Sequence, residues 1–167
     1  AHPDAARGAP VAQEPACDLR QDMARRDTSF YYSFVVLPAR QRRAIVAVWE
    51  FCRAVDDAVD EKAGEQGELS AWREELAACF DGPCVRTREG RNLEPHIRAF
   101  NLTRRNFEAV IDGVEMDLHR LRYQTFNELH EYCLRVASAV GLICIEIFGY
   151  RHPASRQYAI DLGVALQ

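Results

Sequence analysis

The spacing of apolar residues most constrains what this chain can fold into. From about residue 17 onward, apolar side chains recur every three or four positions, as on one face of a helix. We find no convincing stretch that alternates apolar and polar residues as a half-buried strand does. The chain is therefore predicted to be all-α and built from packed helices, and its 167 residues suffice for one domain with a real core.

Breaks in the pattern place the helices along the chain. Residues 1–16, rich in proline and alanine, are predicted to be a disordered or extended arm, and residues 17–167 one helical domain. Thr103 and Thr125 are expected N-caps, and Gly149 an expected C-cap. A polar loop is expected over 84–92. The predicted helices are 18–26, 29–36, 39–61, 69–80, 95–101, 103–121, 126–148 and 153–167.

The last ten residues, YAIDLGVALQ, are still helical in pattern and apolar at Gln167. A natural domain rarely stops inside a helix that has an uncovered apolar stripe. We therefore expect the domain to continue in a longer protein, with self-association through the uncovered face as one way to cover it.

Charge and cysteine usage narrow the class of protein. The net charge of −4 and the pI of about 5.8 argue against a nucleic-acid-binding protein, which is expected to be basic. None of the six cysteines forms a C-x-x-C pair, which disfavours structural zinc and favours a reducing cytoplasmic compartment. No signal-peptide pattern is visible, and the longest apolar run is too short to span a bilayer.

The sharpest chemical signal is an acidic segment, residues 51–61 (FCRAVDDAVDE). On a helix, Asp56 and Asp60 lie one above the other at the edge of an apolar face, and Arg53 points along the same edge. Asp57 lies further round the helix. Like charges four residues apart repel, and carboxylates near a helix C-terminus oppose the macrodipole, each by a few tenths to about 1 kcal/mol.

A hard divalent cation would offset this repulsion. Magnesium takes carboxylate oxygens and keeps coordination sites open for phosphate oxygens, while arginine forms bidentate bonds to phosphate. The plain alternative is a solvated acidic helix end, which is the commoner meaning of an isolated D-x-x-x-D.

Four motifs in order resemble the squalene/phytoene synthase family. They are SFYYSFVVLP (29–38) followed by CRAVDDAVD (52–60), then VEMDL (114–118), EYCLRVASAVG (131–141) and LGVALQ (162–167). The resemblance covers about residues 17–167. It implies the helical bundle of the isoprenoid synthases, of which this chain would form the N-terminal part.

The resemblance also implies an activity, the head-to-head (1′-1) condensation of two prenyl diphosphates, farnesyl or geranylgeranyl, to presqualene/squalene-type or phytoene-type products. It implies Mg²⁺ as cofactor, with NADPH used only if a reductive step follows. The partner is a prenyl diphosphate rather than a nucleic acid, and its greasy chain suits a peripheral membrane contact.

Site residues follow from the resemblance position by position. Asp56 and Asp60 match the first aspartate-rich motif, which holds magnesium, and Asp57 lies inside it. Tyr132 matches a tyrosine that assists ionisation or proton handling. Substrate contacts are implied for Ser29 and Arg53 at the diphosphate, for Phe30, Phe34, Val136, Ala137 and Gly141 along the prenyl tunnel, and for Gln167 at the end of the last motif.

Three points leave alternatives open. Close helix packing is the plain alternative at Ser138, where the family commonly has glycine, and at Gly141; for Tyr132 it is a core tyrosine with a satisfied hydroxyl. The family's second aspartate-rich motif, expected just after LGVALQ, is not in the chain, so the chain alone is expected to be inactive. A non-catalytic scaffold on the same fold, or an unrelated helical binding module, is the alternative function.

Overall fold

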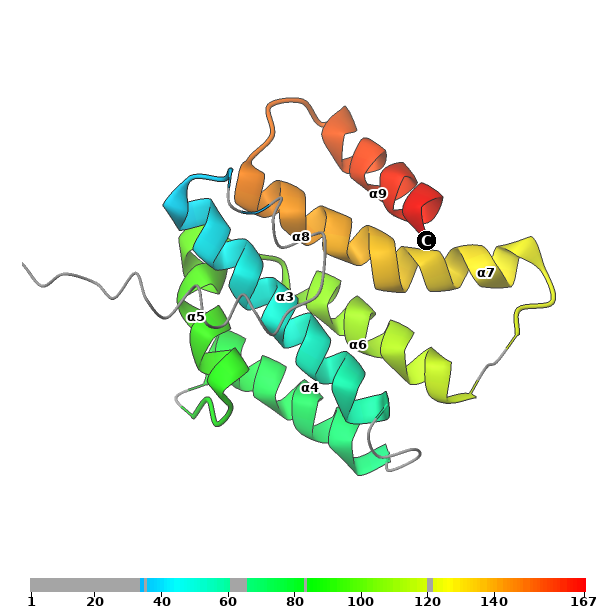
Figure 1. Ribbon diagram of the computed structural model, residues 1–167, viewed down its shortest axis with the longest axis horizontal. Helices are drawn as coiled ribbons and strands as arrows, with labels where there is room; N and C mark the ends of the chain where they lie inside the picture. Colours follow the sequence, from blue (N-terminus) through cyan, green and yellow to red (C-terminus); the bar gives the residue numbers. More distant parts are fainter. Residues whose placement is uncertain (1–33, 35, 61–65, 83, 120–121) are drawn as a thin grey trace, which may run out of the picture. The chain divides into compact units, whose positions relative to one another are not determined.

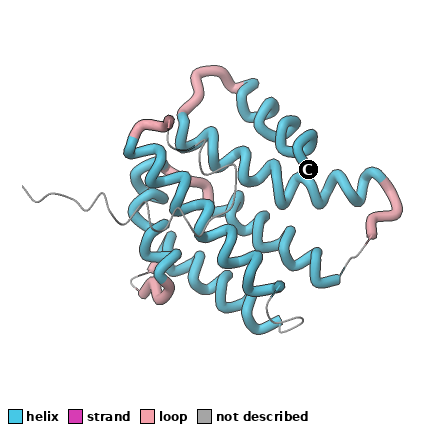
Figure 2. Tube along the Cα trace, viewed as in Figure 1, coloured by secondary structure: helices cyan, strands magenta, loops and turns pink. Residues whose placement is uncertain are grey.

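A computed structural model describes residues 34, 36–60, 66–82, 84–119 and 122–167. Its contacts divide the chain into two units, Ala1–Val36 and Leu37–Gln167, and every helix named below belongs to the second. The described part of this unit contains helices and connecting loops but no strand (Figure 2). The predicted all-α class is therefore confirmed. The predicted arm, the predicted helix 18–26 and most of 29–36 lie outside the described residues.

Most of the predicted helices are present with ends that differ by a few residues (Figure 1). Figure 1 shows α7, the short π-helical turn η1 and α8 following one another along a single line, with α9 returning beside them. The elements are α3 (Ala39–Asp60), α4 (Gln66–Asp81), α5 (Arg88–Phe100), α6 (Arg104–His119), α7 (Phe126–Cys133), η1 (Leu134–Ser138), α8 (Ala139–Phe148) and α9 (Ala154–Leu166).

The predicted loop over 84–92 is wrong in its second half, because α5 already begins at Arg88. The Thr87 hydroxyl caps the helix by accepting a hydrogen bond from the Gly90 N–H at 2.9 Å. Pro95, expected near the start of a helix, lies inside α5. The polar composition of this stretch concealed an ordinary N-cap signal, a threonine followed by an acidic first turn.

The segment predicted as one helix over 126–148 contains a π-helical turn. The Ala139 N–H donates to the Leu134 carbonyl, five residues back, instead of the usual four. Thr125 caps the start by accepting from the Glu128 N–H, and Gly149, at φ 77°, follows the end; both predicted caps are confirmed.

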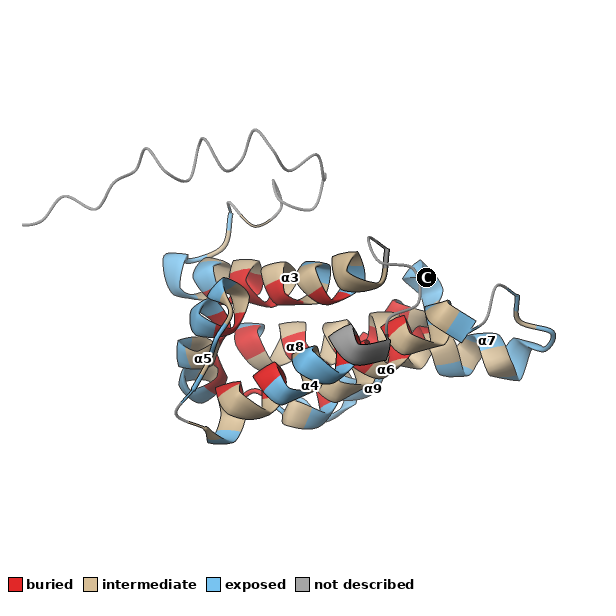
Figure 3. Cartoon of the chain, turned by 90° about the horizontal axis from the view of Figure 1, so that it is seen from below, coloured by how far each residue is buried: buried red, intermediate tan, exposed pale blue. Residues whose placement is uncertain are grey.

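The core of the second unit lies between α3, α4, α5, α6 and α8, whose inward faces are buried (Figure 3). Phe51 on α3 is fully buried and meets Trp72 and Phe107 edge-on, with ring centroids 5.4 and 5.9 Å apart. Phe80 contacts the same Phe107 ring from α4. This aromatic cluster fixes the direction of α3, and therefore the position of its acidic C-terminal end.

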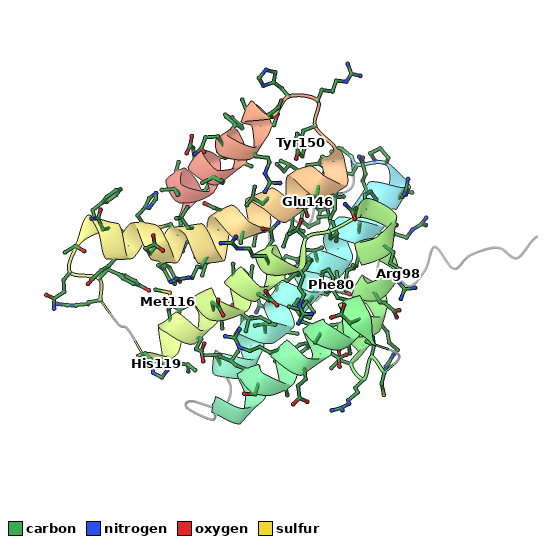
Figure 4. The ribbon with its side chains drawn as sticks, turned by 180° about the vertical axis from the view of Figure 1, so that it is seen from behind. Phe80, Arg98, Met116, His119, Glu146 and Tyr150 are labelled. Atoms are coloured by element: carbon green, nitrogen blue, oxygen red, sulfur yellow. The ribbon has the colours of Figure 1, made fainter. Side chains whose placement is uncertain are left out.

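Glu146, a largely buried carboxylate on α8 that Figure 4 labels, fixes the start of α6; its side chain is 9% exposed. It accepts hydrogen bonds from the Thr103 N–H at 3.0 Å, the Thr103 hydroxyl at 2.7 Å and the Asn106 side chain at 3.2 Å. Thr103 precedes α6 as predicted, and its hydroxyl is committed to Glu146. The contact holds α6 against α8. Asp117 lies on α6, and α8 follows Tyr132 along the chain.

Small residues allow α9 to pack closely on η1 and α8. A Cβ added at Gly163 would lie 2.6 Å from the Ser138 Cα, and one at Gly141 would lie 2.9 Å from the Ala159 carbonyl oxygen. The Ser138 hydroxyl also donates to the Ile160 carbonyl at 2.8 Å. The close-packing alternative for Ser138 and Gly141 is thus what these contacts show.

Candidate functional site

The acidic end of α3 presents its carboxylates in two directions. Asp57 accepts from the Arg53 guanidinium, Nε to Oδ1 at 3.2 Å, and both side chains are about half exposed. Asp56 is exposed on a neighbouring part of the helix surface. Asp60 follows Asp56 by one helical turn; its backbone is helical, and its side chain lies outside the described residues. Arg53 is therefore paired with Asp57 in this structure, and its contact with a diphosphate remains a prediction.

Tyr132 on α7 stands beside a second carboxylate. Its hydroxyl donates to Asp117 Oδ2 on α6 at 3.1 Å, and its ring lies 5.1 Å from the Tyr123 ring at an angle of 34°. Burial raises the pKa of Tyr132 well above its usual value, and the charge and hydrogen bond of Asp117, then Tyr123 and Asp56, add to the rise. Asp56, on α3, therefore lies within electrostatic range of the Tyr132 hydroxyl, on α7.

Two cysteine thiols, Cys52 and Cys144, lie near Asp56. Cys52 precedes Asp56 by one turn of α3, and Cys144 projects from α8. Burial raises the pKa of Cys52 to about 12, with Cys144 and Asp56 adding to it, and burial raises the pKa of Cys144 to about 11. Both thiols stay protonated at neutral pH and give the seam between α3 and α8 an apolar character. The Asp56 carboxylate thus has buried, uncharged thiols for neighbours.

A profile of the squalene/phytoene synthase family matches residues 23–167 of the chain. The chain belongs to the squalene/phytoene synthase family. It is 41% identical over 145 residues to a presqualene diphosphate synthase of Rhodopseudomonas palustris, a match that covers 84% of this chain and 51% of that protein. It is 34% identical over 175 residues to a phytoene synthase of Arthrospira platensis, covering 95% of this chain and 56% of the other.

Solved structures of the family share the fold. A squalene synthase from Alicyclobacillus acidocaldarius superposes with a TM-score of 0.80 at 30% identity, over 90% of this chain and 57% of that one. A dehydrosqualene synthase solved in complex with a ligand gives a TM-score of 0.78 at 28% identity, over 88% and 52%. The chain spans about half the length of the curated relatives it matches.

Three of the predicted tunnel residues of this family member lie on η1 and α8. Val136 and Ala137 are half-buried in the π-helical turn, and Val136 contacts α6, where a Cβ added at Gly113 would lie 2.5 Å from its Cγ1. Gly141 contacts α9 through the Ala159 carbonyl. Gln167 is exposed, and its N–H donates to the Gly163 carbonyl at 3.2 Å. Their contact with a prenyl chain remains a prediction.

Three other predicted substrate residues belong to the first unit, Ala1–Val36, and not to the unit that carries this site. Ser29 and Phe30 lie outside the described residues. Phe34 is helical and half-buried, but it belongs to the first unit, Ala1–Val36. Within the described residues, no group of three or more histidine, cysteine, aspartate or glutamate side chains is arranged to hold a metal ion.

Two residues at the site were not singled out from the sequence. Tyr123 lies in a polar connection before α7, where no periodic pattern marks a residue as buried. Cys144 lies in the apolar sequence of α8, where nothing local marks it as part of a site. Asp117 lies within the VEMDL motif and accepts the hydrogen bond from Tyr132. Only three-dimensional proximity across α3, α6, α7 and α8 relates these residues.

Proposed function

We propose that the chain forms the first part of an enzyme that condenses two prenyl diphosphates head to head. The observation that carries the proposal is the hydrogen bond of 3.1 Å from the Tyr132 hydroxyl, on α7, to Asp117, on α6, with Asp56, on α3, close enough to contribute to the raised pKa of Tyr132. On this proposal the acidic motif and the tyrosine motif, 76 positions apart in sequence, act on the same substrate. The family membership and the presqualene diphosphate synthase and phytoene synthase relatives support this reading.

Magnesium fits the donors that α3 offers. Asp56 and Asp60 stand four positions apart on α3, and aspartate offers the hard carboxylate oxygens that magnesium prefers, with further coordination sites left for phosphate. Asp57, held by Arg53, stands beside them. When bound, the ion would neutralise charge on the diphosphate leaving group. The Arg53 guanidinium, about half exposed, can exchange its partner Asp57 for a diphosphate oxygen.

The proposed condensation breaks one carbon–oxygen bond and forms a cyclopropane ring. The C1–O bond of one allylic diphosphate breaks, and its electron pair leaves with the diphosphate. The double bond of the second substrate attacks the allylic cation, and loss of one proton closes the cyclopropane ring. The products are a cyclopropyl diphosphate, such as presqualene or prephytoene diphosphate, one diphosphate and one proton. NADPH would enter only in a later reduction.

The rings of Tyr123 and Tyr132 suit the cationic step, because aromatic faces stabilise cations. The protonated thiols of Cys52 and Cys144 add no charge to the surroundings of Asp56. Uncharged, apolar surroundings exclude water, which would otherwise capture the cation.

We also propose that the 167-residue chain alone does not turn over substrate, since the family's second aspartate-rich motif is not among its residues. A chimera would test both statements, with the chain replacing the matching half of the Rhodopseudomonas palustris relative. The chimera should form a cyclopropyl diphosphate from farnesyl or geranylgeranyl diphosphate, and the chain alone should not. Turnover by the chain alone would refute the second statement. A folded chimera without product would favour the non-catalytic scaffold.

Contacts with other surfaces are part of the proposal. Tyr158, Leu162 and Leu166 follow one side of α9 at four-residue intervals and are 69%, 43% and 75% exposed. Such a stripe suits a face that self-association covers, or one that rests on a membrane surface. None of the described helices combines the length and apolar character needed to cross a bilayer. Light scattering tests self-association, and co-sedimentation with liposomes tests membrane contact. A chain that stays monomeric and does not sediment with liposomes would contradict both.

A further inference from the structure

The Tyr132 hydroxyl has one proton, and the structure shows where that proton goes. The hydroxyl donates to Asp117 Oδ2 at 3.1 Å, from α7 to α6. A phenol has a single O–H donor and two acceptor lone pairs. While the bond to the carboxylate persists, the hydroxyl can offer only its lone pairs to a third group.

We propose that Asp117 is a positioning residue, which holds Tyr132 as a neutral phenol and presents its oxygen lone pairs, not its proton, to the reacting substrate. This inference rests on the proposed function. The bond to a carboxylate increases the electron density on the phenol oxygen. An electron-rich oxygen stabilises a nearby allylic cation, or accepts the proton lost at ring closure. It does not protonate the departing diphosphate.

The groups around the hydroxyl agree with this assignment. Asp117 approaches from α6, Tyr123 from the connection before α7, and Asp56 from α3, and each opposes formation of a phenolate. Tyr123 also contacts the Tyr132 ring at 5.1 Å and so limits its rotation. The tyrosine is therefore constrained at its hydroxyl by Asp117 and at its ring by Tyr123. Neither constraint depends on a bound ligand.

The contact is testable in the 167-residue chain by NMR with tyrosine labelled at the ζ carbon. The chain has six tyrosines, and Tyr132→Phe assigns the Tyr132 signal. Asp117→Asn and Asp117→Ala should move that signal at neutral pH and should make Tyr132 easier to deprotonate at alkaline pH. Asp112→Asn, on the same helix but paired with Arg73 at 2.7 Å, is the matched control and should leave it in place. An unmoved signal in both Asp117 variants would overturn the proposal.

The positioning role is tested by kinetics in the chimera. Asp117 is exposed, so the isosteric Asp117→Asn change should not prevent folding. It should lower kcat roughly tenfold to a hundredfold, the range expected for a hydrogen bond to a charged group, with little change in KM. In a Tyr132→Phe background, Asp117→Asn should lower kcat no further.

A loss of equal size in the Tyr132→Phe background would show that Asp117 acts independently of Tyr132, and would overturn the inference. If the unsubstituted chimera makes no product, the proposed function fails instead. The NMR comparison still decides, in that case, whether Asp117 holds the hydroxyl.

Discussion

Glu75, a buried carboxylate with no part in the candidate site, gives the sharpest stability prediction. It projects from α4 with only 5% of its surface exposed, and it accepts hydrogen bonds at the start of α5. Its donors are the Arg86 N–H at 3.0 and 3.1 Å, the Thr87 N–H at 2.7 Å and the Thr87 hydroxyl at 2.8 Å. One side chain thus anchors both the connection and the cap of α5.

The magnitude follows from these contacts. Glu75→Gln keeps the shape but removes the charge, and its amide NH₂ would face donors that need an acceptor. A hydrogen bond to a charged group contributes about 1.5–3 kcal/mol, and a buried donor without an acceptor costs about 1–3 kcal/mol. We expect the free energy of unfolding to fall by roughly 2–3 kcal/mol, because the loss of one such bond dominates. For a chain of this length the melting temperature should fall by roughly 4–12 °C.

The neighbouring Glu74 is the matched control. It is exposed and lies 3.9 Å from Arg86, so Glu74→Gln should change stability by less than about 0.5 kcal/mol. Urea unfolding followed by circular dichroism measures both variants. Equal stability of Glu75→Gln and the unsubstituted chain would refute the assignment of Glu75 as an anchor.

The effect of Glu75 should depend on pH in a defined direction. Burial alone would raise its pKa, but the hydrogen bonds from Thr87 and Arg86 outweigh burial and lower it. A lowered pKa means that the stabilisation is complete above the ordinary value of about 4.3 and disappears as the pH falls through the folded-state value. The stability gap to Glu75→Gln should be constant from about pH 8 to 5 and shrink below that. A gap that widened in acid would contradict this.

Two further predictions concern packing and thiol chemistry. Gly163→Ala should destabilise the chain by roughly 1–3 kcal/mol, although alanine has the better helix propensity, because the new Cβ meets the Ser138 backbone. In the exposed control, Ala165→Gly, only the propensity loss of about 1 kcal/mol is expected. Urea unfolding measures both variants, and a Gly163→Ala variant more stable than the unsubstituted chain would contradict the prediction. At pH 8 a thiol reagent should modify exposed Cys84 quickly and buried Cys79, whose pKa is raised to about 11, slowly. Cys84→Ser should therefore remove a fast phase that Cys79→Ser leaves unchanged, and the reverse pattern would refute it.

Helical periodicity and local capping signals predicted most of the fold. The predicted helix 39–61 matches α3 closely, because its apolar face runs unbroken from Ala44 to Val55 and no glycine or proline interrupts it. The start of α5 was missed because Arg88 and Glu89 resemble a polar loop, and its anchor, Glu75, comes from another helix. A contact of that kind leaves no trace in the local pattern.

The site could be predicted only where its residues lie in motifs. Asp56 and Tyr132 each stand in a segment that resembles the family, and the sequence alone singled them out as candidates. Their common orientation depends on how α3 and α7 pack, which no single segment encodes. Tyr123, and the hydrogen bond from Tyr132 to Asp117, became visible only when these helices were placed together.

The π-helical turn shows the same limit. Residues 134–138 (LRVAS) contain no glycine or proline, and the sequence predicted an ordinary helix there without interruption. The wider turn coincides with close approaches of Gly113 on α6 to Val136 and of Gly163 on α9 to Ser138. Packing from two sides, rather than local propensity, distinguishes this turn.

The most direct test of the central proposal is calorimetric titration of a non-hydrolysable farnesyl diphosphate analogue into the chimera, with and without magnesium. Binding should require magnesium. Asp56→Asn should weaken it at least roughly tenfold, because loss of even outer-shell partners costs about 10–100-fold in metal affinity. The matched control, Asp161→Asn on the exposed side of α9, should bind as the unsubstituted protein does. Binding that ignores magnesium, or that Asp56→Asn leaves unchanged, would contradict the diphosphate site on α3.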